Sequence, residues 1–166
     1  MAVIRRSLLF FLVFACLQLG WQALRGTEVE TLVVHDATVR PATVLINLLT
    51  PSAYARAVNF TIAAPGGGLN IQNGCEGTEV LFLLWASLLV APLSWRSRGI
   101  GIAVGTLVVF VVNQVRIAIL FYAYRADHAL FDRLHGSVTP LLMILVVGSY
   151  FYGWLLHARP TTSAAA

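Results

Sequence analysis

The sequence predicts an all-α integral membrane protein, a bundle of four transmembrane helices with a short interfacial helix and a small extracytoplasmic hairpin. Of its 166 residues, 58% are hydrophobic and only 11% are charged, which is too little polar surface to cover a soluble globule of this size. Four apolar runs are long enough to cross a bilayer, which takes about 20 helical residues. They cover residues 7–24, 80–95, 99–124 and 138–157. We interpret residues 1–160 as one membrane domain and residues 161–166 as a disordered tail.

The first apolar run begins after Arg5 and Arg6, as a secretory signal peptide would. The residues that follow it, 21–25, offer no small-x-small cleavage site, and the run is longer than the apolar part of most signals. We therefore predict a retained transmembrane helix.

Residues 25–76 form a segment between the first two predicted spans that is too apolar for a disordered linker. Residues 41–49 begin with a proline and end before Pro51, which predicts a short interfacial or re-entrant helix. Residues 58–62 and 69–71 alternate apolar and polar side chains around a Pro-Gly-Gly-Gly turn. This pattern predicts two short strands that deliver the chain to Cys75.

Arginines near the ends of the runs give the orientation. Counting alone gives a tie, but Arg96 and Arg98 occupy a very short connection, and Arg5 and Arg6 lead the first run. This favours a cytoplasmic N-terminus, with residues 25–76 outside a cytoplasmic (inner) membrane. The arginines form no single basic face, so we expect no nucleic-acid partner despite a pI near 9.6. Histidines and cysteines lack zinc-ligand spacing, so we expect no metal, and no other cofactor is indicated.

Cys75 is the first candidate for chemistry. A helix is predicted to open at Asn73, with Glu76 reaching back in a capping box. Cys75 would then lie in the first turn, where the helix dipole favours a thiolate. Gly74 and Gly77 leave room for a substrate backbone. The alternative is a small buried cysteine with no chemical role.

Arg116 interrupts the third apolar run about 17 residues, or roughly 26 Å, beyond the cytoplasmic boundary at Arg98. A charge there is costly, so it is expected to face the bundle interior and to neutralise a partner. Asn113 lies one turn earlier on the same face and is placed to brace the guanidinium or contact substrate. An arginine that snorkels to the outer interface is the alternative.

His135 precedes the last predicted span, which Ser137 is expected to cap. Its imidazole titrates near neutral pH and therefore suits proton transfer. An interfacial loop histidine is the plain alternative, and His128 is the rival candidate. Under the four-span topology, Cys75, Arg116 and His135 all reach the outer membrane face. A thiol, a base and a fixed cation suffice for acyl transfer.

Three short motifs also carry a family resemblance: Asn-Gly-Cys-Glu-Gly at residues 73–77, Asn-Gln-Val-Arg at 113–116 and Leu-His-Gly at 134–136. In this order they resemble the exosortase/archaeosortase family over about residues 65 to 157. The chain looks like a compact member, with fewer spans than many relatives. The resemblance implies that Cys75 is the nucleophile, Arg116 the essential arginine and His135 the general base.

By the same resemblance, the substrates would be exported proteins with a C-terminal sorting signal, made of a short motif, one membrane span and a basic cluster. The predicted function is therefore that of a membrane cysteine peptidase or transpeptidase. Two other interpretations stay open at this point. One is a lipid or acyl transferase that works through a Cys75 thioester, and the other is a non-enzymatic membrane scaffold.

Overall fold

The first transmembrane helix has the predicted position. A computed structural model describes residues 2–71 and 74–158, and in it helix α1 covers Ala2–Leu24. Its side chains are apolar all round and most of them are exposed, which suits a helix that faces lipid. Helix α1 ends at Leu24, and Gly26, two residues further on, adopts a left-handed conformation with φ of +79°. The predicted tail, residues 161–166, lies outside the described residues.

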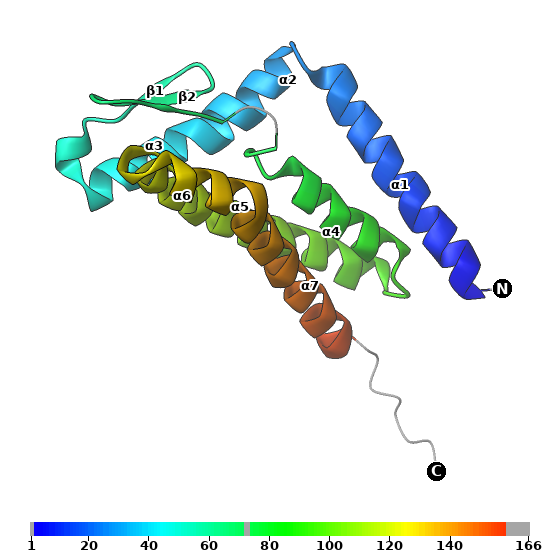
Figure 1. The fold of residues 1–166 in the computed structure, drawn as a ribbon. Coiled ribbons are helices and arrows are strands. Elements are labelled where there is room, and N and C mark those ends of the chain that lie inside the picture. Colours follow the sequence, from blue (N-terminus) through cyan, green and yellow to red (C-terminus); the bar gives the residue numbers. More distant parts are fainter. Residues whose placement is uncertain (1, 72–73, 159–166) are drawn as a thin grey trace.

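A single longer helix replaces the short interfacial helix predicted at residues 41–49. It is continuous over α2 (Glu28–Glu30), a π-helical stretch η1 (Thr31–Val39) and α3 (Arg40–Leu49). In η1 the chain uses i→i+5 hydrogen bonds, as from the Arg40 N–H to the His35 carbonyl. The sequence pattern predicts that Pro41 begins a helix. In the structure, the wider π-helical turn before Pro41 lets the proline lie inside a longer helix. Figure 1 shows this helix running across the direction of α1 and α7.

The hairpin has three strands where two were predicted. Strands β1 (Arg56–Val58), β2 (Thr61–Ala63) and β3 (Leu69–Asn70) pair antiparallel in the order β1-β2-β3. Asn59, with φ of +50°, turns the chain inside the stretch that alternation had suggested was one strand. Between α3 and β1 lies a short 3₁₀ turn, η2 (Pro51–Ala53).

Helix α4 is shorter than the span predicted at residues 80–95. It covers Thr78–Val90, 13 residues or about 20 Å, and the chain leaves the helix at Ala91 before Pro92. Arg98 then donates to the carbonyls of Ala91 and Leu93 and so holds the turn closed. The predicted class of an all-α membrane protein is confirmed, although Glu28–Leu49 replaces residues 80–95 among the helices of spanning length. Within residues 2–71 and 74–158, four helices are long and apolar enough to cross a membrane. They are Val3–Leu24, Glu28–Leu49, Trp95–Ala126 and His128–His157.

The last two spans pack closely against each other. Helix α5 covers Trp95–Ala126, and a second continuous helix follows as α6 (His128–Arg133), a π-helical stretch η3 (Leu134–Val138) and α7 (Thr139–His157). The predicted cap at Ser137 is wrong, because Asp127 caps this helix ten residues earlier. On α5, Gly101 and Gly105 admit the rings of Trp154 and Tyr150, which leave no room for a Cβ atom.

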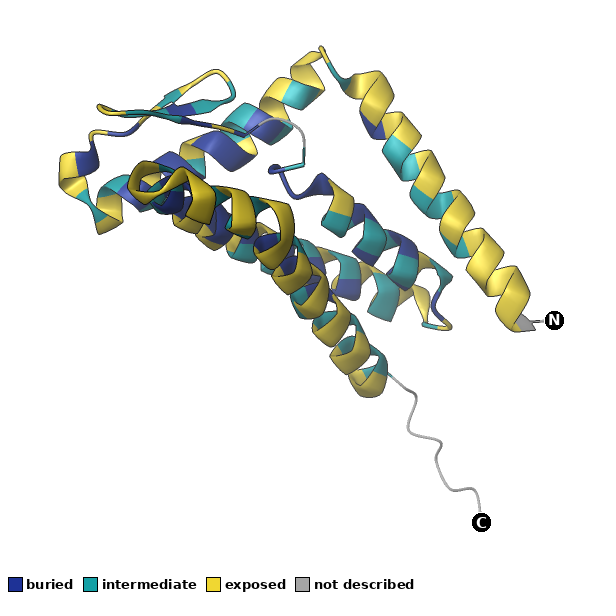
Figure 2. Ribbon diagram, in the orientation of Figure 1, coloured by how far each residue is buried: buried dark blue, intermediate teal, exposed yellow. Residues whose placement is uncertain are grey.

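The most buried side chains gather where α3, α5, the hairpin and the start of α4 meet, as the dark ribbon segments in Figure 2 show. This cluster contains Ile62, Ile71, Cys75, Ile117 and Phe121. A second, smaller cluster joins α4, α5 and α7. The candidate nucleophile therefore lies in the main core of the molecule and not at its lipid-facing surface.

Candidate active site

Cys75 lies in a tight loop just before α4. Only 2% of its surface is exposed. The loop contains two left-handed glycines, Gly74 with φ of +97° and Gly77 with φ of +81°. Helix α4 begins after Gly77, so Cys75 precedes the helix and does not lie in its first turn as predicted. Asn73, the predicted N-cap, lies outside the described residues.

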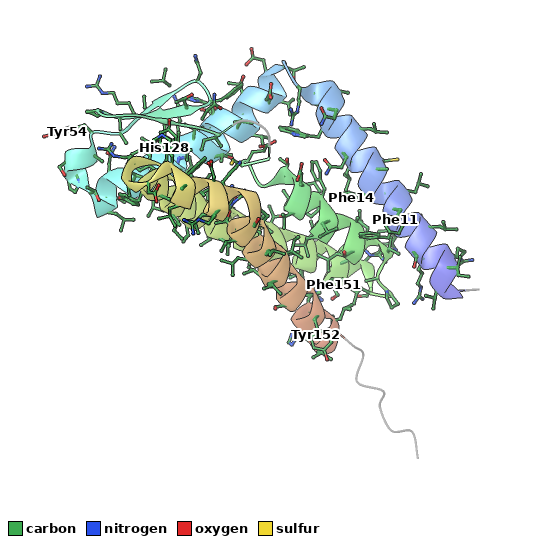
Figure 3. The ribbon with its side chains drawn as sticks, viewed as in Figure 1. Phe11, Phe14, Tyr54, His128, Phe151 and Tyr152 are labelled. Carbon is green, nitrogen blue, oxygen red and sulfur yellow. The ribbon has the colours of Figure 1, made fainter. Side chains whose placement is uncertain are left out.

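His135 is the nearest partner of the thiol. Its Nδ1 atom lies 3.3 Å from the Cys75 sulfur. The imidazole stacks on the Phe131 ring with centroids 5.2 Å apart and planes inclined by 7°, and Tyr124 meets Phe131 edge-on. Phe131 in α6 and His135 in η3 are four residues apart on one continuous helix, which places them on the same face. The rival, His128, which Figure 3 labels, packs against Tyr124 instead, with ring centroids 4.7 Å apart.

Arg116 is buried on α5, with 7% of its surface exposed, and does not snorkel to an interface. Its Nε donates to the Thr139 hydroxyl over 3.1 Å, and one terminal nitrogen donates to the Gly74 carbonyl over 3.3 Å. Within residues 2–71 and 74–158, no carboxylate forms an ion pair with this guanidinium. The cation is thus fixed next to the cysteine loop with charge still available for a developing anion.

Asn113 holds the loop from the same helix. Its amide nitrogen donates to the carbonyls of Cys75 and Glu76, each over 3.1 Å. The prediction placed Asn113 against Arg116 or the substrate, but these bonds connect it to the loop backbone. Gly77 packs so closely on Asn113 that a Cβ atom there would come within 3.0 Å of the amide carbon.

Glu76 stabilises the loop from the other side. Its carboxylate accepts the Gly74 N–H over 2.7 Å and lies 3.6 Å from the Arg25 guanidinium, and 3% of its side chain is exposed. The capping-box prediction is wrong, because Glu76 precedes α4 and its carboxylate accepts the Gly74 N–H from within the loop. Sequence reasoning did not single out Arg25 or Thr139, because each contributes through a contact between distant parts of the chain. It also missed Phe131, although the spacing of four residues to His135 is a signal for a contact on one helix face.

Burial raises the pKa of the Cys75 thiol above its usual value. The nearby Arg116 guanidinium opposes this change by lowering the pKa, and the Glu76 carboxylate raises the pKa further. The expectation of a thiol acidified by a helix dipole is therefore wrong, because the sulfur is buried ahead of the helix. In this environment the resting thiol is protonated. A base must take the proton as the sulfur attacks, and His135 is within reach.

This raised pKa gives a first prediction. In a Cys16→Ser background, alkylation of Cys75 is expected to rise with pH to a midpoint above that of the same thiol in denatured protein. Arg116→Gln is expected to move the midpoint higher still, because it removes the charge that favours the thiolate. Rates of iodoacetamide labelling from pH 6 to 11 measure both, and a folded midpoint below the denatured one would contradict the assignment.

Gly77 gives a second prediction. Gly77→Ala is expected to lower the free energy of unfolding by about 1–3 kcal/mol, because the new methyl group meets Asn113 and the left-handed backbone disfavours alanine. Gly153→Ala is the matched control, since its Cβ would meet nothing within 4 Å on α7. Thermal unfolding in detergent compares the two variants. Equal stability of both would show that the Gly77–Asn113 contact is not tight.

Fold and site together define a multi-pass membrane protein that gathers a thiol, an imidazole and a guanidinium at one end of its helices. The chain belongs to the transmembrane exosortase family, whose model matches residues 2–152. The match confirms the resemblance and extends it to the first span and residues 25–64, where no motif had been recognised. Searches of curated proteins and of solved structures found no match.

Proposed function

We propose that the protein is a membrane cysteine peptidase or transpeptidase that cleaves a C-terminal sorting signal of exported proteins through a thioester on Cys75. The observation that carries the proposal is the 3.3 Å contact between the Cys75 sulfur and His135, beside the buried Arg116. Family membership supports the processing of sorting signals as the biological role. Nucleophile, base and cation are the groups that acyl transfer requires.

In the proposed first half-reaction, His135 takes the Cys75 proton as the sulfur attacks the scissile carbonyl. Arg116 stabilises the negative charge that develops on the carbonyl oxygen. The tetrahedral intermediate then expels the amine, which receives its proton from His135, and a thioester remains on Cys75. Attack by water gives hydrolysis, and attack by an acceptor amine gives transfer.

We propose that the site faces the extracytoplasmic side of the cytoplasmic (inner) membrane. Arg96 and Arg98 lie in the first turn of α5, beside the short connection from α4 and at the opposite end of the helix from Arg116's loop contacts, and arginines next to short connections favour the cytoplasm. The substrate's C-terminal span would dock from the lipid. A groove of about 390 Å³ between α1, the end of α4 and α7 is lined in part by Phe11 and Phe151, which Figure 3 labels, and it lies at the other end of the helices from Cys75.

The test is to trap the covalent intermediate. The full-length enzyme is co-expressed with membrane proteins that carry a C-terminal span followed by arginines, quenched in acid and examined by mass spectrometry. A substrate peptide attached to Cys75 supports the proposal. A fatty acyl group on Cys75 contradicts it and favours a lipid or acyl transferase. Unprocessed substrates with unmodified Cys75 also contradict it and favour a scaffold.

A further inference from the structure

Gly74, the residue directly before Cys75, is held at both of its polar backbone groups. Its N–H donates to the Glu76 carboxylate over 2.7 Å, and its carbonyl accepts from Arg116 over 3.3 Å. The backbone at Gly74 is left-handed, with φ of +97°. Rotation of this backbone would break one of the two bonds, so together they fix the loop that presents the Cys75 sulfur to His135.

The bond at the N–H depends on a buried carboxylate. Only 3% of the Glu76 side chain is exposed, and a carboxylate in such a place is unfavourable unless a cation lies near it. Arg25 supplies the cation, with a terminal nitrogen 3.6 Å from Glu76 Oε1, and the Thr78 hydroxyl lies 3.5 Å from the same oxygen. Among the described residues, no other cation forms an ion pair with this carboxylate.

Arg25 belongs to the first span and not to the cysteine loop. It follows Leu24, the last residue of α1. One turn earlier, Trp21 is the only buried side chain of α1 among those that the structure describes, and it packs into the core cluster that contains Cys75. The other end of α1 is largely exposed, as Figure 2 shows. The first span is therefore attached to the site at its C-terminal end, by a buried ring and an ion pair.

We propose that Arg25 is a positioning residue for catalysis, which pairs with Glu76 and so holds the cysteine loop in the shape that brings Cys75 to His135. Arg25 acts through Glu76 and not on the reacting atoms. Its effect on processing rests on the proposed thioester chemistry, whereas its effect on the loop does not. The first span thereby controls a site to which it contributes no reacting group.

Arg25→Gln leaves the Glu76 carboxylate buried without its cation. The carboxylate is then expected to turn toward water, and the Gly74 N–H loses a charge-assisted acceptor. Misplacement of a reacting group by about 1 Å can cost roughly a hundredfold in rate. We expect the single-turnover rate at saturating substrate to fall about tenfold, while the half-saturating substrate concentration changes by less than about twofold.

The matched control is Arg40→Gln, which removes the cation from an exposed ion pair with Asp36. It should process substrate within about twofold of the parent rate, because exposed ion pairs contribute little and this one lies outside the cysteine loop. A tenfold fall in Arg40→Gln as well would overturn the proposal, since any lost arginine would then have the same effect.

Two further variants test whether the charge pair is the cause. Arg25→Lys keeps a cation within reach of the carboxylate and should recover the rate to within about threefold of the parent. In a Glu76→Gln background the carboxylate charge is absent, so Arg25→Gln should lower the rate by less than about twofold more. A tenfold fall in both backgrounds, or Arg25→Lys as slow as Arg25→Gln, would overturn the proposal, because Arg25 would then act without Glu76.

Hydrogen–deuterium exchange of the full-length protein in detergent tests the loop apart from peptide processing. In Arg25→Gln we expect the peptide that contains residues 74–77 to exchange at least about fivefold faster than in the parent, while α5 and α7 keep their parental rates. Unchanged exchange at residues 74–77, or an equal rise in all helices, would overturn the positioning role.

The two measurements also separate this proposal from the proposed function. If the parent processes substrate and Arg25→Gln processes it equally well, the positioning role fails and the proposed function stands. If the parent processes no substrate but exchange at residues 74–77 rises selectively in Arg25→Gln, the proposed function fails and the hold of Arg25 on the loop stands.

Discussion

Cys75→Ala is expected to lower substrate processing by at least about a thousandfold, since it removes the atom that forms the thioester. The Cys75 side chain is buried in the main core, but it is small, so its replacement by alanine leaves only a minor void. The variant is therefore expected to insert and fold. Cleavage of a tagged substrate, measured by the mobility of its product, gives the rate.

Cys16→Ala is the matched control for this prediction. Cys16 is the other free cysteine and lies exposed on α1, so its loss should leave processing within about twofold of the parent. Cys75→Ser gives a second comparison of nearly the same shape. A serine hydroxyl is far harder to deprotonate than a thiol, so this variant is also expected to be almost inactive. Full processing by Cys75→Ala would refute the nucleophile assignment.

The sequence was most informative where a residue is energetically unfavourable among its sequence neighbours, as a charge is within an apolar run. Arg116 stands in an apolar run, and the cost of a charge there indicates burial in the bundle, which is how the structure has it. The expected neutralisation of a charged partner is not seen among the described residues, where Arg116 donates to the Thr139 hydroxyl and the Gly74 carbonyl. Likewise, the low fraction of charged residues and the long apolar runs were enough for the fold class, because a bilayer sets the length of a span.

Local sequence patterns predicted the structure less reliably where one pattern is compatible with two backbone conformations. Alternation over residues 58–62 cannot show that Asn59 reverses the chain, and Pro41 is compatible with a helix start and with a π-helical turn. The length of α4 depended on Ala91 and Pro92, which end the helix inside a run that hydropathy alone would continue. The observed bounds of individual helices and strands therefore differ from the predicted ones, although the predicted fold class is correct.

The environment of the thiol could not be predicted from nearby residues. Its pKa depends on burial, and that burial comes from contacts with η3, α5 and the hairpin core, which are far away in sequence. The ion pair between Arg25 and Glu76 joins the end of the first span to the loop across about fifty residues. No spacing rule links such positions, so only the folded chain shows them together.

Arg116→Gln is expected to reduce processing about a hundredfold to a thousandfold, the usual effect of losing one donor to an oxyanion. Glutamine removes the charge and cannot reach both the Thr139 hydroxyl and the Gly74 carbonyl. Arg116→Lys keeps the charge but not the planar fork that makes two directed contacts, so it should recover only part of the rate. Single-turnover rates of substrate cleavage measure both variants.

The matched control is Arg125→Gln, which removes an exposed charge near the end of the same helix. It should change processing by less than about threefold, because Arg125 packs over Phe121 and does not contact the cysteine loop.

A purely structural role for Arg116 makes a different prediction. In that case Arg116→Gln would lower the melting temperature and the yield but leave the rate per folded molecule near that of the parent. The rate per folded molecule separates the two roles, because the titration midpoint of Cys75 moves upward in either case once the nearby charge is lost.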